Sequence, residues 1–193
     1  MKITFIAAAI ALGLLAPAVS QAAPLCPVFP FAVNTDCNIV LTIGPGGALS
    51  TTAGASTTST YDGVEDVIIG VINNSGGTVN SINIASSTNT SIYGFDGDGI
   101  DTYGGTSDSK DTSGYGGPIG YFTNINGALT SGTLNFDGGL ANGGFTYFSL
   151  EEAITFNQIV VTSGPTVPEP STLLMMGTGI AGFAGALRRK FAK

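Results

Sequence analysis

The chain has 193 residues, a length that suits one ordinary domain with short appendages. It contains no histidine, which excludes Ser–His–Asp and Cys–His catalysis. Between residues 24 and 165 a single lysine, Lys110, stands against twelve acidic residues, a formal charge of −11. Such a surface repels nucleic acid, so no nucleic-acid partner is expected, and divalent cations are its natural counterions.

Residues 1–22 have the features of a secretory signal peptide. Lys2 supplies the positive start, and the apolar stretch Ile3–Leu15 is short for a membrane span. Ser20 and Ala22 are the small residues expected before a cleavage site at Ala23. The segment predicts export of the body that follows, and an uncleaved N-terminal anchor is the alternative.

Cys26 and Cys37 are the only two cysteines in the chain. Export places them in an oxidising compartment, where a disulfide is the expected state. Closing this short loop is worth roughly 3 kcal/mol in the chain-entropy description. Two unpaired thiols are the alternative.

Residues 23–163 show short β-branched and aromatic runs separated by Gly, Asn, Asp and Ser, which predicts an all-β ectodomain with the architecture of an antiparallel β-sandwich. The predicted strands are 38–43, 64–72, 78–84, 119–124, 132–136, 145–150 and 154–161. Turns are predicted at 74–77, 126–127, 137–139 and 142–144. The low-complexity stretch 44–60 is either a loop or a polar edge strand.

A run of carboxylates separated by glycines is the main candidate for chemistry. It comprises Asp96, Asp98 and Asp101, with Asp108 and Asp111 downstream. Such spacing suits a weak calcium site, because Ca²⁺ takes six to eight oxygen ligands, although it departs from the EF-hand pattern. The alternative is a polar turn in which Asp and Gly serve the backbone geometry.

Two further acidic groups give weaker signals. Asp62, Glu65 and Asp66 lie at the start of the predicted strand 64–72, and we expect a solvated strand entry there. Glu151 and Glu152 are neighbours that would point to opposite faces of a strand, which does not suit a glycosidase pair. No enzymatic activity is therefore expected.

Tyrosines are frequent among Gly and Asn residues in this region, where exposed rings would stack on sugars. The alternative is that several of them are half-buried sheet residues. They are Tyr61, Tyr93, Tyr103, Tyr115 and Tyr121.

Residues 164–193 form a distinct C-terminal segment. Residues 171–187 are uncharged, and as a helix they span about 25 Å, slightly less than the ~30 Å hydrocarbon core. The basic tail 188–193 follows with Arg188, Arg189 and Lys190, which the positive-inside rule keeps in the cytoplasm. We expect a single transmembrane helix with the ectodomain outside, and a soluble core helix is the alternative.

Three features in order, Pro168-Glu169-Pro170, the apolar span and the basic end, resemble the PEP-CTERM sorting signal. The resemblance covers 167–193. It implies a precursor held transiently in the inner membrane of a Gram-negative bacterium and processed by exosortase, an integral-membrane cysteine protease. It also implies that Pro168, Glu169 and Pro170 form the recognition motif, and such proteins often accompany exopolysaccharide production.

The body from about residue 61 to 155, with GFDGDGI and SGYGGPIGYFTNI, resembles an ectodomain that recurs among PEP-CTERM proteins. That resemblance implies a sandwich at the cell surface and no particular activity. The sequence thus predicts an exported, surface-sorted protein with a structural or adhesive role in the exopolysaccharide or biofilm matrix. A carbohydrate-binding module at the cell surface is the alternative, and Ca²⁺ is the one candidate cofactor.

Overall fold

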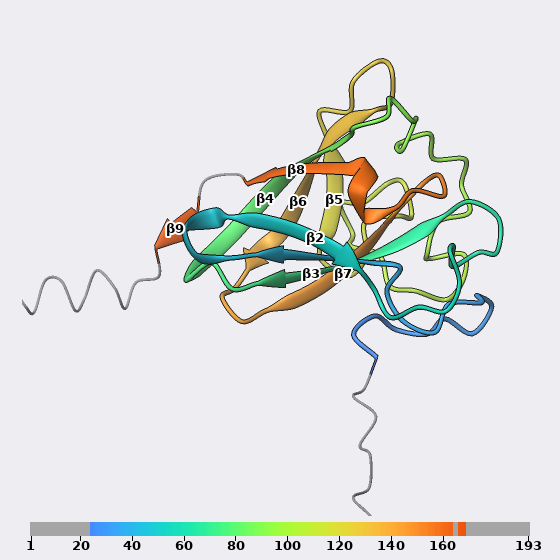
Figure 1. Ribbon diagram of the computed structural model, residues 1–193, viewed down its shortest axis with the longest axis horizontal. Helices are drawn as coiled ribbons and strands as arrows, with labels where there is room; N and C mark the ends of the chain where they lie inside the picture. The colour runs from blue at the N-terminus through green and yellow to red at the C-terminus, as the bar shows by residue number, and fades with distance from the viewer. Residues whose placement is uncertain (1–23, 164–165, 169–193) are drawn as a thin grey trace, which may run out of the picture.

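The computed structural model describes residues 24–163 and 166–168, which form two packed β-sheets (Figure 1). Sheet A has the strand order β2–β1–β3–β7, and sheet B has the order β5–β6–β4–β8, with β9 also paired to β4. The strands are β1 Ile39–Ile43, β2 Leu49–Ala53, β3 Val67–Asn73, β4 Gly77–Ser86, β5 Gly120–Thr123, β6 Ser131–Leu140, β7 Phe145–Leu150, β8 Ile159–Ser163 and β9 Thr166–Pro168. The β-sandwich prediction is confirmed.

Helical structure in the described residues consists of two 3-10 turns, Pro45–Gly47 and Phe156–Gln158. In this part of the chain no helix has the length and apolar character that a membrane span requires. The predicted signal helix at 1–22 and the predicted transmembrane helix at 171–187 lie outside the described residues.

Sheet A departs from a purely antiparallel arrangement at one pair. After the β1–β2 hairpin the chain returns along residues 54–66 and enters β3 on the other side of β1, in the same direction. The β1–β3 pair is therefore parallel, whereas β3–β7 and every pair of sheet B are antiparallel. For the stretch 44–60 the sequence left two interpretations, a loop or a polar edge strand. The structure shows that it contributes β2, a polar edge strand.

The predicted turn at 137–139 is wrong, because Asp137, Gly138 and Gly139 lie inside β6. Both glycines have positive φ, and the register with β4 shifts between Val79 and Ser81. Extra residues in one strand of an antiparallel pair produce a β-bulge, and glycine accepts the conformation that a bulge requires. The Gly-Gly signal therefore marks a bend within a strand.

The hydrophobic core lies between the two sheets. Alternating residues of β1, β4 and β6 point inward, which is the pattern of strands with one buried face. Phe148 of β7 is fully buried in this core. The inward-facing residues of β1, β3, β4 and β6 include Ile39, Leu41, Ile43, Val67, Ile69, Val71, Ile82, Ile84, Leu134 and Phe136.

A second apolar cluster covers the other face of sheet A. Ile68 of β3 packs there with residues from the N-terminal segment and from the loops, namely Cys26, Phe29, Cys37, Tyr61 and Ile100. Cys26 and Cys37 form the predicted disulfide, which crosses β3 at Gly70. A Cβ at Gly70 would approach Cys37 Sγ to 2.6 Å, so only glycine leaves room for the bridge. Burial on both faces explains the unbroken apolar run at the start of β3.

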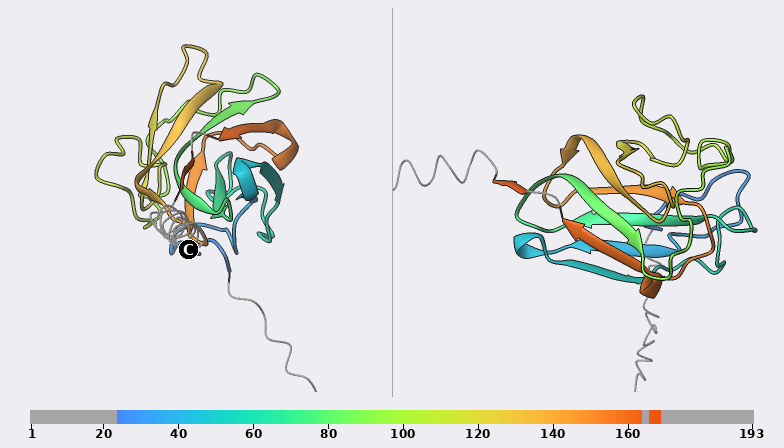
Figure 2. Two further views of the ribbon diagram at one scale, coloured as in Figure 1. Left: turned by 90° about the vertical axis from the view of Figure 1, so that its left-hand side faces the viewer. Right: turned by 90° about the horizontal axis from the view of Figure 1, so that it is seen from above.

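The long connections gather at one end of the sandwich and β9 lies at the other (Figure 1), as the right-hand view of Figure 2 also shows. At the β9 end, Pro168 pairs with Gly77 and Thr166 pairs with Val79. At the loop end, residues 87–119 connect β4 to β5. This end carries the acidic residues that form the candidate site.

Candidate functional site

The candidate site begins where β3 starts and β7 ends. These strands are antiparallel, and Val67 pairs with Leu150 as the last register pair at this end. Asp66 directly precedes β3 and Glu151 directly follows β7, so the two carboxylates lie at the same end of this strand pair. Both side chains are buried, with 0% of Asp66 and 7% of Glu151 exposed.

The connection between β4 and β5 packs over this end of β3 and β7. Its Tyr115 is anchored to β7, because the Ser149 amide donates a hydrogen bond to the Tyr115 carbonyl at 2.8 Å. The Tyr115 hydroxyl then lies 2.6 Å from Asp98 Oδ1, 2.8 Å from Glu151 Oε2 and 3.4 Å from Asp96 Oδ1. A phenol has one proton to donate, so it satisfies only one of these three carboxylate oxygens at a time.

Asp66 is the most deeply buried member of the group. Its Oδ2 accepts a hydrogen bond from the Tyr61 hydroxyl at 2.8 Å, while Oδ1 has no hydrogen-bond partner among the described residues. A buried carboxylate oxygen without a partner loses its hydration with no compensation. Most buried polar atoms have a partner, so this oxygen requires an explanation.

Asp62 occupies the turn that leads into β3. Its Oδ1 accepts hydrogen bonds from the backbone amides of Val64, Glu65 and Asp66, at 3.0–3.1 Å. This turn fixes the position of the Asp62 carboxylate relative to Asp66. The expected solvated strand entry is therefore wrong for Asp66, because the fold covers it with loops from distant parts of the sequence.

The carboxylates form two groups of three. Asp62, Asp66 and Asp98, called the inner triad below, each place one oxygen within 4.8 Å of the other two. Glu65, Asp96 and Glu151, called the outer triad, satisfy the same condition. The Tyr115 hydroxyl joins the two groups through Asp98 and Glu151.

Burial raises the pKa of Asp66 to about 8, and the nearby carboxylates of Glu151, Asp98 and Asp62 add to the rise, although the Tyr61 hydrogen bond opposes it. Burial is also the largest cause of the raised pKa values of Asp98 and Glu151. The pKa of Tyr115 is raised by burial and by its hydrogen bonds to carboxylates, so it stays a donor. Burial and neighbouring carboxylates are thus the causes of these upward shifts, and no basic side chain is among the causes.

The predicted calcium residues separate in the structure. Asp98 belongs to the inner triad and Asp96 to the outer triad, while Asp101 is exposed and belongs to neither. Asp111 accepts hydrogen bonds from the backbone amides of Ser113, Gly114 and Gly116, the turn-forming role that was the alternative.

Sequence reasoning missed Asp62, Glu65, Asp66 and Glu151 as partners of Asp98. Glu151 was placed on a strand with Glu152, but β7 ends at Leu150 and Glu152 has a φ of 87°. The available signal is that these acidic residues lie at strand ends: Glu65 and Asp66 near the start of the predicted strand 64–72, and Glu151 directly after 145–150. Only the pairing of those two strands makes that signal meaningful.

The tyrosines are mostly internal. Tyr61, Tyr93 and Tyr115 are buried, and Tyr103 and Tyr121 are partly exposed. Lys110 lies over the Tyr121 ring at 5.6 Å and forms an ion pair with Asp137 at 2.6 Å. These five tyrosines therefore do not form a surface of exposed rings on which sugars could stack.

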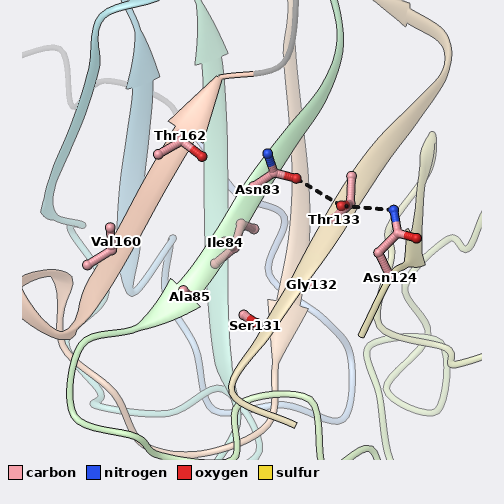
Figure 3. A pocket seen from close by; sticks show the side chains of 9 residues that line it. All are labelled: Asn83, Ile84, Ala85, Asn124, Ser131, Gly132, Thr133, Val160 and Thr162. Carbon is pink, nitrogen blue, oxygen red and sulfur yellow. Dashed lines mark hydrogen bonds between the residues drawn. The ribbon is translucent and has the colours of Figure 1, made fainter. Parts of the chain in front are cut away.

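A depression of about 420 Å³ lies on sheet B across β8, β4 and β6, where polar side chains share one face (Figure 3). The hydroxyl of Thr133 donates to Asn83 Oδ1 at 2.9 Å and accepts from Asn124 Nδ2 at 3.4 Å. No aromatic side chain is among the residues that line it, which are Asn83, Ile84, Ala85, Asn124, Ser131, Gly132, Thr133, Val160 and Thr162.

Of the predicted sorting residues, Pro168 is the last residue of β9 and pairs with Gly77 at the edge of sheet B. Glu169, Pro170 and the basic residues Arg188, Arg189 and Lys190 lie outside the described residues.

No curated protein and no solved structure matches the chain. Residues 166–190 match the family model of the PEP-CTERM protein-sorting motif. The match includes Pro168, Glu169 and Pro170, the apolar stretch and the first basic residues. The chain thus carries a PEP-CTERM protein-sorting motif, which implies an exported, membrane-anchored precursor that exosortase, a membrane protease, processes for the cell surface.

Proposed function

We propose that this protein is a non-catalytic structural or adhesive component of the exopolysaccharide matrix at the surface of a Gram-negative bacterium. The observation that carries the proposal is the sorting motif at 166–190, which gives the body a destination. The body suits an extracellular position because a disulfide ties its N-terminal segment to sheet A. A chain without histidine also lacks the commonest general base.

Sorting is tested by replacing Pro168, Glu169 and Pro170 with alanine in a chain with a C-terminal epitope tag. The apolar stretch is unchanged, so membrane insertion should survive, whereas recognition of the motif should be lost. In a host that carries exosortase, the wild type should lose the tag, and the triple variant should accumulate as a tagged full-length product in the inner membrane. Immunoblotting of membrane and surface fractions measures this.

The matched control is Thr162→Ala, an exposed change in β8 that leaves the motif intact and should be processed like the wild type. A host without exosortase should retain the tag on every variant. Equal loss of the tag from wild type and triple variant in the exosortase host would show that the motif does not direct processing.

A carbohydrate-binding role is the second candidate, and the polar depression on sheet B favours it. Asn and Thr side chains on one face offer amide and hydroxyl groups suited to sugar hydroxyls. On a glycan array, binding by the wild type and at least tenfold weaker binding by Asn83→Ala would support this role. Thr102→Ala, an exposed change in the loops, is the control. Absence of binding to any glycan would leave the structural role as the better account.

A further inference from the structure

We propose that the inner triad, Asp62, Asp66 and Asp98, binds one Ca²⁺ ion. The first argument is the buried Asp66 Oδ1. It is fully shielded from solvent and has no partner among the described residues, although it belongs to a side chain that contributes an oxygen to the triad. A bound cation would supply the missing partner, because a buried carboxylate oxygen is stable when it is hydrogen-bonded or coordinates a metal.

The spacing of the oxygens fits this ion. Calcium–oxygen distances are 2.3–2.6 Å, so two ligands on opposite sides of one Ca²⁺ lie about 5 Å apart. The three triad oxygens lie within 4.8 Å of one another, close enough to share an ion. Because the turn amides hold Asp62 and the Tyr115 hydroxyl contacts Asp98, the ligands are positioned by groups that are not themselves ligands.

The charge balance points to a divalent cation. Lys110 is the only basic residue between 24 and 168, and it pairs with Asp137 instead of with the cluster. The outer triad adds three carboxylates next to the inner one, and the single Tyr115 proton is shared among Asp96, Asp98 and Glu151. Apart from the hydrogen bonds that the Tyr61 and Tyr115 hydroxyls donate, no described side chain compensates the carboxylates of the two triads.

The donor set favours a hard divalent cation such as calcium over zinc or copper. All the candidate ligands are carboxylate oxygens, which suit hard cations. The softer donors preferred by zinc and copper are not available, because the chain has no histidine and both cysteines form the disulfide. Extracellular calcium modules have dissociation constants of about 10⁻⁴–10⁻³ M, and we expect the same range here.

The test uses the full chain, purified in detergent, treated with EGTA and exchanged into chelator-free buffer at physiological ionic strength. Titration with CaCl₂ should show saturable binding in calorimetry, and millimolar CaCl₂ should raise the thermal unfolding midpoint. Asp66→Asn and Asp98→Asn should each weaken calcium binding at least tenfold. Asp101→Asn, which changes a neighbouring carboxylate outside both triads, should bind like the wild type.

The unfolding midpoint of Asp66→Asn, measured with and without calcium, also separates a loss of calcium binding from a general loss of folding. Without calcium it replaces a buried carboxyl group whose Oδ1 has no partner among the described residues by an uncharged amide of the same shape, so its unfolding midpoint should equal or exceed that of the wild type. With calcium the order should reverse, because only the wild type gains the ion. Terbium luminescence excited through tyrosine gives a second readout, since the Tyr61 hydroxyl lies 2.8 Å from Asp66.

The proposal is overturned if the wild type shows neither binding heat nor a calcium-dependent midpoint. It is equally overturned if Asp66→Asn and Asp98→Asn bind calcium as tightly as the wild type, because the ion would then be held by the acidic surface in general.

Discussion

Replacing Gly117 with alanine is expected to lower the free energy of unfolding by about 3 kcal/mol or more. Gly117 has a φ of 74°, and a Cβ there would overlap the carbonyl oxygen of Tyr147 in β7. The backbone must then move away from β7, although Gly117 also accepts a hydrogen bond from the Asp108 amide at 2.8 Å. Chemical denaturation followed by circular dichroism measures the loss.

Two further glycine-to-alanine variants separate the causes. Gly143 has a φ of 77° and open space around it, so Gly143→Ala should cost about 1 kcal/mol from backbone strain alone. Gly127 has open space and no positive φ, so Gly127→Ala should change stability by less than about 0.5 kcal/mol. A Gly117→Ala variant no less stable than Gly143→Ala would show that the contact with Tyr147 is not limiting.

The consequence for the candidate site is direct. Tyr115 lies two residues before Gly117, and its hydroxyl contacts both carboxylate triads. A shift of this backbone moves the hydroxyl away from Asp98 and Glu151. The close approach at Gly117 is thus what brings the acidic connection onto the sandwich.

Removing the disulfide by Cys26→Ala with Cys37→Ala is expected to cost about 3 kcal/mol. The bridge links the N-terminal segment to the start of sheet A, and Asp36 Oδ1 accepts hydrogen bonds from both cysteine amides at 2.8 and 2.7 Å. Denaturation of the oxidised wild type and of the double variant measures the difference.

The single variants Cys26→Ala and Cys37→Ala are the matched controls. Each breaks the same bridge, so each should lose nearly as much stability as the double variant. If the singles are as stable as the wild type, the bridge contributes nothing. Loss of the bridge should also loosen Tyr61, whose ring packs 6.1 Å from Phe29 and whose hydroxyl donates to Asp66.

Local patterns predicted the strands well where one face is buried. The alternation in 145–150 gave β7 with its bounds, and 78–84 gave most of β4. The prediction at 154–161 merged the 3-10 turn Phe156–Gln158 with β8, because β-branched and aromatic residues occur on both sides of Asn157 and Gln158. Periodicity gives the type of an element more reliably than its ends.

The pairing of strands that are distant in the chain could not be predicted from the sequence. The parallel β1–β3 pair depends on which side of β1 the chain returns to, and no local residue pattern encodes that choice. The same limit applies to the acidic site. Asp66 and Glu151 are 85 positions apart, and the β3–β7 register brings them together. Asp98 was found from its glycine spacing, which is a local signal.

β9 and the acidic site lie at opposite ends of the sandwich. β9 pairs with the Gly77 end of β4, close to where β3 ends, since the Asn73 side chain donates to the Gly77 carbonyl at 2.8 Å. The carboxylates lie at the opposite end of β3, beside Val67, about 20 Å away by the rise of a seven-residue strand. The acidic loops therefore lie at the end of the sandwich opposite β9, the last described strand before the sorting segment continues (Figure 1).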